Sequence, residues 1–229
     1  MIDVHLLLNC PDSSLEVMPI DHTVMLLPAL GEDGAQAAAL RSAFEEVTQV
    51  LMPDISVRGT SPVILEEPAL RVLDAMPSAR TSRVLLIGGG WGAMIALQIA
   101  AKQVDRVAAL ILSTNARPET IAIRSLFYGV LSLLPATVVQ QLGGRPDDVA
   151  ALLDQVRPVD IKPLAVRVTA PALVIVGERD IANRGPSAAL ARSLPLGNLR
   201  VVPQAGPGWQ TKDPQLVVEL VADFLSRPT

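Results

Sequence analysis

Short apolar runs alternate with longer amphipathic stretches along most of this chain. Uninterrupted apolar runs are typical of strands buried on both faces of a parallel sheet. We predict strands at 2–8, 15–20, 23–27, 84–87, 105–112, 172–177 and 198–203, with one more ending near 51–60. Apolar residues recur at helical spacing over 35–50, 62–76 and 91–101, and a last helix begins at Asp213-Pro214. The alternation predicts an α/β protein with about eight mostly parallel strands, opened by an antiparallel hairpin.

The alternation of strands and helices is interrupted between residues 117 and 165. This stretch contains helical patterns only, over 118–134 and 147–156. The first is apolar almost all round, and the second is more amphipathic. We interpret residues 1–229 as a single domain with a helical insertion at 117–165.

Composition excludes several classes of function. The chain is 50% hydrophobic and 18% charged, which indicates a globular protein, and its net charge of −4 without basic clusters argues against nucleic-acid binding. Cys10 is the single cysteine, so no internal disulfide forms, and a reducing cytoplasmic location is expected. Residues 1–5 lack the basic region of a signal peptide. Residues 83–102 are uncharged between their ends, but their glycines and strand–turn–helix pattern argue against a membrane span.

The segment from Arg83 to Lys102 contains the strongest local pattern. A branched apolar run, Val84 to Ile87, is followed by Gly88-Gly89-Gly90 and then by a helical pattern that begins at Trp91. Strand, tight turn and helix in this order usually present the apex of the turn to a ligand. We therefore expect the ligand site at this turn.

This segment resembles the nucleophile elbow of the α/β-hydrolases, strand–G-x-S-x-G–helix. Gly88 and Gly92 match the outer glycines, but Gly90 stands where the family has its nucleophilic serine. Two further segments extend the resemblance. The apolar run from Ala172 ends in Gly-Glu-Arg-Asp180, which implies that Asp180 is the triad acid. Pro203 and Pro214 fit the frame around the catalytic histidine and place Pro207 at its position.

The resemblance implies an α/β-hydrolase fold with a small helical lid at 117–165, but the chemistry of the family is incomplete. A Ser-His-Asp mechanism needs a nucleophile and a base, and neither Gly90 nor Pro207 can act as one. We interpret His5 and His22 as ordinary surface or edge residues. The other candidate nucleophiles have no neighbour in the sequence suited to activate them: Cys10, Ser113 and Thr114. We therefore predict that the protein is not a serine hydrolase.

Backbone donors for an oxyanion are still implied by the resemblance. The N–H of Trp91 occupies the position of one donor, and the N–H of Ala29 or Leu30 supplies the other, since Pro28 has none. Such donors at a helix N-terminus stabilise charge on a carbonyl oxygen without a covalent step. Asp180 is interpreted either as a carboxylate at the edge of the cleft or as a salt-bridge partner of Arg179 or Arg184.

An aromatic-walled pocket is expected at the same place. Trp91 and Trp209 are the only tryptophans, one beside the apex and one two residues beyond Pro207. Arg124 and Tyr128, four residues apart in the lid, either point into this pocket or extend outward, and the outward arrangement is favoured. The expected substrate-binding residues are Pro28, Gly90, Trp91, Arg124, Phe127, Tyr128, Pro207 and Trp209.

Two functions follow from this interpretation. One is a cofactor-free and metal-free enzyme that binds and polarises an apolar carbonyl compound and promotes its cyclisation, isomerisation or elimination, as some relatives in specialised metabolism do, including cyclases of the cycloaddition type. The other is an inactive pseudo-hydrolase that binds a ligand or a protein. Gly88-x-Gly90-x-x-Ala93 also fits a dinucleotide-binding pattern, but the next strand ends without the acidic residue which that pattern needs.

Overall fold

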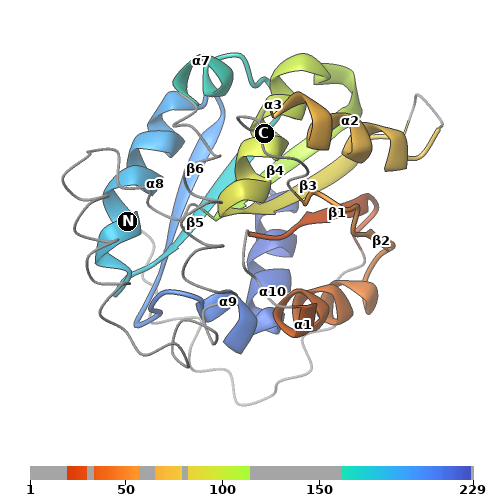
Figure 1. Ribbon diagram of the computed structural model, residues 1–229. Helices are drawn as coiled ribbons and strands as arrows, with labels where there is room; N and C mark the ends of the chain where they lie inside the picture. The colour runs from red at the N-terminus through yellow and green to blue at the C-terminus, as the bar shows by residue number, and fades with distance from the viewer. Residues whose placement is uncertain (1–19, 30–33, 57–64, 79–81, 114–160, 228–229) are drawn as a thin grey trace, which may run out of the picture.

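The computed structural model describes residues 20–29, 34–56, 65–78, 82–113 and 161–227 (Figure 1). The strands are β1 (Thr23–Leu27), β2 (Val50–Leu51), β3 (Val84–Gly89), β4 (Val107–Ser113), β5 (Ala172–Gly177) and β6 (Gly197–Val202). The helices are α1 (Gly34–Glu45), α2 (Glu66–Ala75), α3 (Gly90–Lys102), α7 (Lys162–Ala165), α8 (Ile181–Ser193), α9 (Trp209–Lys212) and α10 (Pro214–Leu225). A 3₁₀ turn, η2 (Val104–Arg106), precedes β4.

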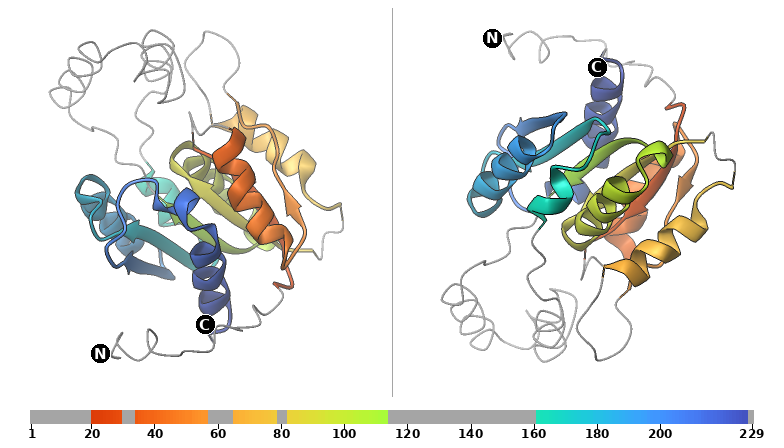
Figure 2. Two further views of the ribbon diagram at one scale, coloured as in Figure 1. Left: turned by 90° about the horizontal axis from the view of Figure 1, so that it is seen from below. Right: turned by 90° about the horizontal axis from the view of Figure 1, so that it is seen from above.

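The described strands form one parallel sheet in the order β2-β1-β3-β4-β5-β6. Successive side chains of a strand point to opposite faces, so each strand contributes to two core clusters. Helices α1 and α10 cover one face of the sheet, and α2, α3, α7 and α8 cover the other (Figure 2). The predicted α/β class with a mostly parallel sheet is therefore confirmed.

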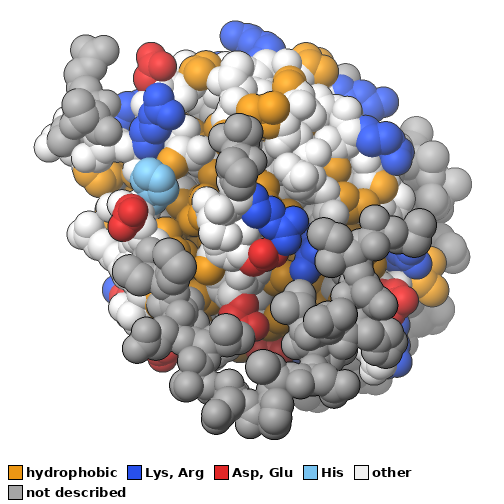
Figure 3. All heavy atoms as spheres, turned by 180° about the vertical axis from the view of Figure 1, so that it is seen from behind, with side chains coloured by type: hydrophobic (Ala, Val, Ile, Leu, Met, Phe, Trp, Pro, Cys, Tyr) orange, Lys and Arg blue, Asp and Glu red, His pale blue; other side chains and the backbone are white. Residues whose placement is uncertain are grey.

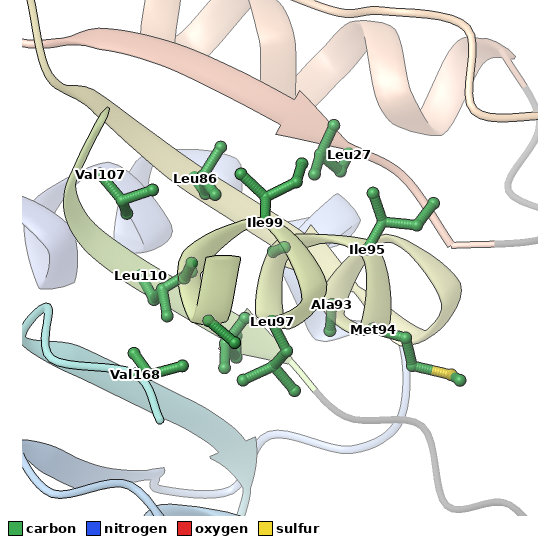
Figure 4. Close-up of a cluster of buried hydrophobic side chains, with 14 of the residues drawn as sticks. Leu27, Leu86, Ala93, Met94, Ile95, Leu97, Ile99, Val107, Leu110 and Val168 are labelled. Atoms are coloured by element: carbon green, nitrogen blue, oxygen red, sulfur yellow. The ribbon is translucent and has the colours of Figure 1, made fainter. Parts of the chain in front are cut away.

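The larger of the two core clusters lies between the sheet and the helices α2, α3, α7 and α8, and α3 lies at its centre. Every residue from Trp91 to Ala101 is buried, and Ile95 and Ile99 lie over Leu27 and Leu86 of the sheet (Figure 4). The apolar character of this segment is thus explained by burial inside the domain. Within the described ranges, no helix is long and apolar enough to cross a membrane.

Some predicted boundaries are corrected by the structure. The helix expected over 35–50 ends at Glu45, where the N–H groups of Val47 and Thr48 both bond to the carbonyl of Phe44. Val50 instead pairs with Val24, because a branched side chain packs well on a pleated sheet. Residues 104–106 form the 3₁₀ turn, so the next strand begins later than the predicted residue 105.

Other predictions fall almost entirely outside the described residues. These are the opening hairpin at 2–8 and 15–20, of which only Ile20 is described and belongs to no strand, and the lid at 117–165, of which only 161–165 are described, with α7 at its end. On the face shown in Figure 3, basic and acidic side chains are interspersed with apolar ones.

Candidate functional site

A crevice is expected where β1 and β3 end side by side. Leu27 pairs with Gly88, so the chain beyond β1 passes Pro28 and Ala29 beside the end of β3. The helices that follow these two strands cover opposite faces of the sheet, α1 on one and α3 on the other. In open α/β sheets this divergence marks the ligand site, at the carboxyl ends of the strands. This general rule makes the β3–α3 turn the candidate site without use of a sequence motif.

The β3–α3 turn has the geometry of a tight elbow. Gly89 is extended, with φ −103° and ψ 138°, and Gly90 follows with φ +44° in the left-handed region. A Cβ on Gly92 would lie 1.9 Å from the carbonyl oxygen of Leu27, and one on Gly88 would lie 2.7 Å from the nitrogen of Ala93. Gly88 and Gly92 therefore need glycine for packing, and Gly90 favours glycine because of its backbone conformation. The predicted strand, tight turn and helix are confirmed.

The side chain of Trp91 is directed into the core. It is 3% exposed, and its indole Nε1–H donates to the carbonyl oxygen of Ile55 at 3.0 Å. Arg71 donates to the neighbouring carbonyl oxygens of Asp54 and Ser56, so the three successive carbonyls of this loop are held from the elbow and from α2. The indole thus fixes the loop after β2. The backbone N–H of Trp91 lies in the first turn of α3, where N–H groups have no acceptor within the helix.

The far end of α3 is anchored as well. Glu66 accepts hydrogen bonds from Lys102 at 3.0 Å and from Gln98 at 3.1 Å. The hydrogen bond from Lys102 is the main reason why the pKa of Glu66 lies below its ordinary value. Because α3 is held at both ends, the elbow at its start has a fixed position relative to the sheet.

Asp180 is 8% exposed and caps the next helix. Its Oδ1 accepts from the backbone N–H of Asn183 at 3.3 Å, and its Oδ2 accepts from the Asn183 side-chain amide at 2.7 Å. The structure thus gives Asp180 this amide partner where the sequence suggested Arg179 or Arg184. Both carboxylate oxygens are engaged in holding the first turn of α8.

The loop that contains Pro207 is bonded to the loop that contains Asp180. The N–H of Arg179 donates to the carbonyl oxygen of Ala205 at 2.8 Å, and the N–H of Gln204 donates to Glu178 Oε2 at 2.8 Å. A Cβ on Gly177 would lie 2.4 Å from the Ala205 oxygen. Pro207 itself is exposed. The loops after β5 and β6 are therefore adjacent, as the resemblance implies for an acid and a base.

Comparison with solved structures supports this architecture. A thermophilic esterase from Thermogutta terrifontis matches with a TM-score of 0.70 and 23% identity, over 91% of this chain and 90% of that one. The enol-lactonase from Burkholderia xenovorans LB400 matches with a TM-score of 0.68 and 22% identity, over 90% and 92%. An alpha/beta hydrolase enzyme from the metagenome of sediments of the lagoon of Mar Chica, Morocco, matches with 0.66 and 16%, over 91% and 92%. The chain has the α/β-hydrolase fold.

Comparison by sequence finds no relatives, in contrast to comparison by structure. No family model matches the chain, and no curated protein matches it. At identities of 16% to 23%, this likeness to solved structures shows the fold alone.

The second tryptophan of the expected pocket lies elsewhere in this fold. Trp209 is 6% exposed and belongs to the cluster beneath α1 and α10, whereas Trp91 belongs to the cluster around α3. The two indoles are therefore on opposite faces of the sheet and do not form one wall. The indole N–H of Trp209 is buried, and no described residue provides it with a hydrogen-bond acceptor.

Two polar residues meet beside the elbow. The side-chain amide of Gln210, in α9, donates from Nε2 to the Oγ of Ser113 at 2.6 Å. Ser113 ends β4 and pairs with Gly89, one residue before the apex. Ser113 was expected only as a possible nucleophile, and Gln210 was not among the predicted site residues. The available indication was its position, three residues beyond Pro207.

The remaining candidates are only partly tested by the structure. Pro28 and Ala29 lie beside the elbow, whereas Leu30, Arg124, Phe127 and Tyr128 fall outside the described residues. Two hollows are found away from the elbow: one of about 230 Å³ between β6 and α10, and one of about 160 Å³ between α2 and α3. Within the described part of the chain, no cluster of three metal-binding side chains occurs.

Proposed function

We propose that this protein is a non-hydrolytic member of the α/β-hydrolase fold that binds an apolar carbonyl compound at the β3–α3 turn. Its proposed activity is that of a cofactor-free cyclase or isomerase of specialised metabolism, with cycloaddition as one reaction of this type. The observation that carries the proposal is Gly90, which has the left-handed backbone of the apex, φ +44°, but no side chain. The elbow is therefore built without a nucleophile.

The proposed catalytic groups are backbone donors. The N–H of Trp91 lies in the first turn of α3, where the helix dipole favours negative charge. A second N–H from Ala29 or Leu30 is proposed to complete the pair. Two donors fixed in this way lower the energy of a transition state in which charge develops on a carbonyl oxygen. Ring closure or bond migration in a polarised carbonyl compound then needs no covalent intermediate.

Asp180 is proposed to act as a positioning residue in this scheme. Its two oxygens accept from Asn183, which supports a capping role over proton abstraction from a substrate. The substrate is proposed to contact Pro28, Gly90 and Pro207, together with Arg124, Phe127 and Tyr128 of the lid segment. The backbone of Trp91 contributes the donor.

The class of ligand is supported by the neighbours in fold. An enol-lactonase and an esterase are both named for action at an ester carbonyl. Binding at a carbonyl carbon and its oxygen requires oxyanion donors, which we propose for the N–H of Trp91 and for that of Ala29 or Leu30, whereas hydrolysis requires a nucleophile and a base, for which Gly90 and Pro207 provide no side-chain group. A carbonyl compound that rearranges fits this combination of retained and missing groups.

A pseudo-hydrolase that only binds a ligand or a protein is the second candidate. It is favoured because two candidate side chains are already engaged within the protein. The Trp91 indole donates to the carbonyl of Ile55, and the Asp180 carboxylate accepts from Asn183. Binding without conversion distinguishes this function from the first.

Turnover in ¹⁸O-labelled water tests the proposal. The protein is incubated with a panel of apolar diketones, enones and aryl esters, and the products are analysed by mass spectrometry against a protein-free blank. We expect a product with the mass of its substrate and no ester hydrolysis. An acid product carrying enzyme-dependent ¹⁸O would overturn the non-hydrolytic claim. Binding with no product would favour the pseudo-hydrolase.

A further inference from the structure

We propose that Ser113 and Gln210 form a polar subsite that recognises a second oxygen of the ligand, beside the carbonyl bound at the elbow. The ligand class is an enolisable β-dicarbonyl compound or a β-hydroxy carbonyl compound. This inference rests on the proposed function, because it takes the Trp91 N–H as the donor to the first carbonyl.

The position of Ser113 follows from the register of the sheet. It pairs with Gly89 across β3 and β4, and neighbouring strands lie about 4.8 Å apart. Its neighbour Leu112 points into the α3 cluster, so Ser113 points to the opposite face, the side of α9. The hydroxyl therefore stands at the carboxyl edge of the sheet, one strand away from the apex.

Gln210 reaches this edge from a distant part of the chain. It is 97 positions from Ser113 in the sequence, yet its Nε2 lies 2.6 Å from the hydroxyl oxygen. Both side chains are half-buried, so neither is sealed in the core. The two residues thus form a polar pair at the rim of the proposed site.

The direction of this hydrogen bond determines what the pair offers to a ligand. The Ser113 oxygen accepts from the amide, so its own hydrogen remains to be donated. Gln210 keeps Oε1 as an acceptor and a second N–H as a donor. A donor and an acceptor side by side complement an enol or a hydroxyl group, each of which also presents one donor and one acceptor.

The competing explanation is that the pair only ties α9 to the sheet. In that case, removing either side chain lowers stability and leaves the choice between ligands unchanged. In a recognition site, the same changes remove the preference for a ligand that has the second oxygen. The two explanations are therefore separated by a ratio of affinities within each variant.

Benzoylacetone and butyrophenone are suitable probes. They share a phenyl ketone, and butyrophenone has a methylene where benzoylacetone has the second oxygen-bearing carbon. NMR spectra of ¹⁵N-labelled protein report on both halves of the site: the Trp91 backbone amide on the elbow, and the Gln210 side-chain amide, assigned with Gln210→Leu, on the subsite. We expect both compounds to shift the Trp91 signal, and benzoylacetone alone to shift the Gln210 signal.

The affinities of the variants complete the test. One hydrogen bond corresponds to a factor of about three to ten in affinity, so the wild type should prefer benzoylacetone by at least that factor. Ser113→Ala and Gln210→Leu should each abolish the preference, and Ser113→Thr, which keeps the hydroxyl, should restore most of it. Thr211→Ala serves as the matched control in α9, because among the described residues its hydroxyl bonds to the Gly208 carbonyl and not to Ser113 or Gln210, and it should leave the preference unchanged.

The contradicting outcomes are distinguishable. If both compounds shift Trp91 but bind equally and leave Gln210 unmoved, the subsite is wrong and the proposed function stands. If benzoylacetone is preferred equally by wild type and both variants, the pair is only a structural tie. If neither compound binds or shifts Trp91, the proposed carbonyl site itself fails, and the subsite fails with it.

Discussion

The β3–α3 elbow and the β5–α8 loop differ in what their residues contribute. At the elbow the backbone is in the left-handed region, with φ +44° at Gly90, and no side chain is present at the apex. In the β5–α8 loop the Asp180 side chain is present, but both of its oxygens accept hydrogen bonds from Asn183. The shape of the elbow is therefore maintained by packing and does not depend on a side chain at its apex.

The packing that maintains the elbow gives the largest expected effect. Gly92→Ala would place a methyl group 1.9 Å from the Leu27 carbonyl oxygen, a backbone atom within the sheet. We expect a loss of about 3 kcal/mol or more in the free energy of unfolding, measured by urea denaturation. Gly177→Ala, the corresponding change between the acid and base loops, should also destabilise. Gly206→Ala is the control, because nothing lies within 4 Å of its added Cβ; equal stability of all three variants would contradict the packing account.

The backbone conformation of the apex gives the next effect. Gly90→Ala places a Cβ in the left-handed region, and such strain costs about 1–3 kcal/mol. Gly90→Asn should cost less, because asparagine tolerates this region better than alanine. Urea denaturation of both variants provides the measurement. Identical stability of wild type and Gly90→Ala would mean that the turn is not an elbow.

Substitution of the two tryptophans tests whether the hydrogen bond of Trp91 stabilises the elbow. Trp91→Phe leaves the carbonyl of Ile55 without the indole donor, whereas Trp209→Phe removes a donor that has no acceptor in the part of the chain that the structure describes. Both changes delete the same atoms from a core, so the difference between them isolates the hydrogen bond. In urea denaturation, we expect the free energy of unfolding of Trp91→Phe to lie below that of Trp209→Phe by about 1 kcal/mol or more. The reverse order would show that the Trp91 bond does not hold the elbow.

The capping role of Asp180 gives the smallest effect on stability. Asp180→Ala should cost about 1 kcal/mol, and Asp180→Asn only a few tenths, because asparagine caps a helix as well as aspartate does. Turnover of a converted ketone should survive Asp180→Asn with modest loss. A loss of about a hundredfold or more in kcat, without unfolding, would instead make Asp180 a base that abstracts a proton.

Much of the fold could be predicted because buried strands and amphipathic helices are local patterns. Val84 to Ile87 and Gly88 to Gly92 specify strand and turn within a few residues. The end of α1 could not be predicted in this way, since the pairing of Val50 with Val24 competes with the helical pattern and depends on contacts 26 residues apart. Local periodicity also does not determine on which face of the sheet a residue after a strand packs, which is why Trp91 and Trp209 were wrongly expected in one pocket.

Of the candidate site, the glycine turn could be predicted from the sequence, because its glycines directly follow a buried strand. The role of the Trp91 N–H as an oxyanion donor stays a prediction. The partners of the side chains depend on long-range contacts: Trp91 with Ile55, 36 positions away, and Gln210 with Ser113, 97 positions away. Asp180 is an exception in the other direction. Asn183 lies three residues beyond it, so a capping residue at a helix start could have been inferred from the sequence.

Intact-mass spectrometry after treatment with a fluorophosphonate probe tests the central claim, that this elbow has no nucleophile. A known serine hydrolase serves as the positive control, and Gly90→Ser tests whether a restored serine reacts without a base. The account predicts that the wild type remains unmodified, and that Gly90→Ser reacts slowly at most, because Pro207 provides no base. Stoichiometric modification of the wild type at any serine, Ser113 in particular, with loss of turnover would contradict the account.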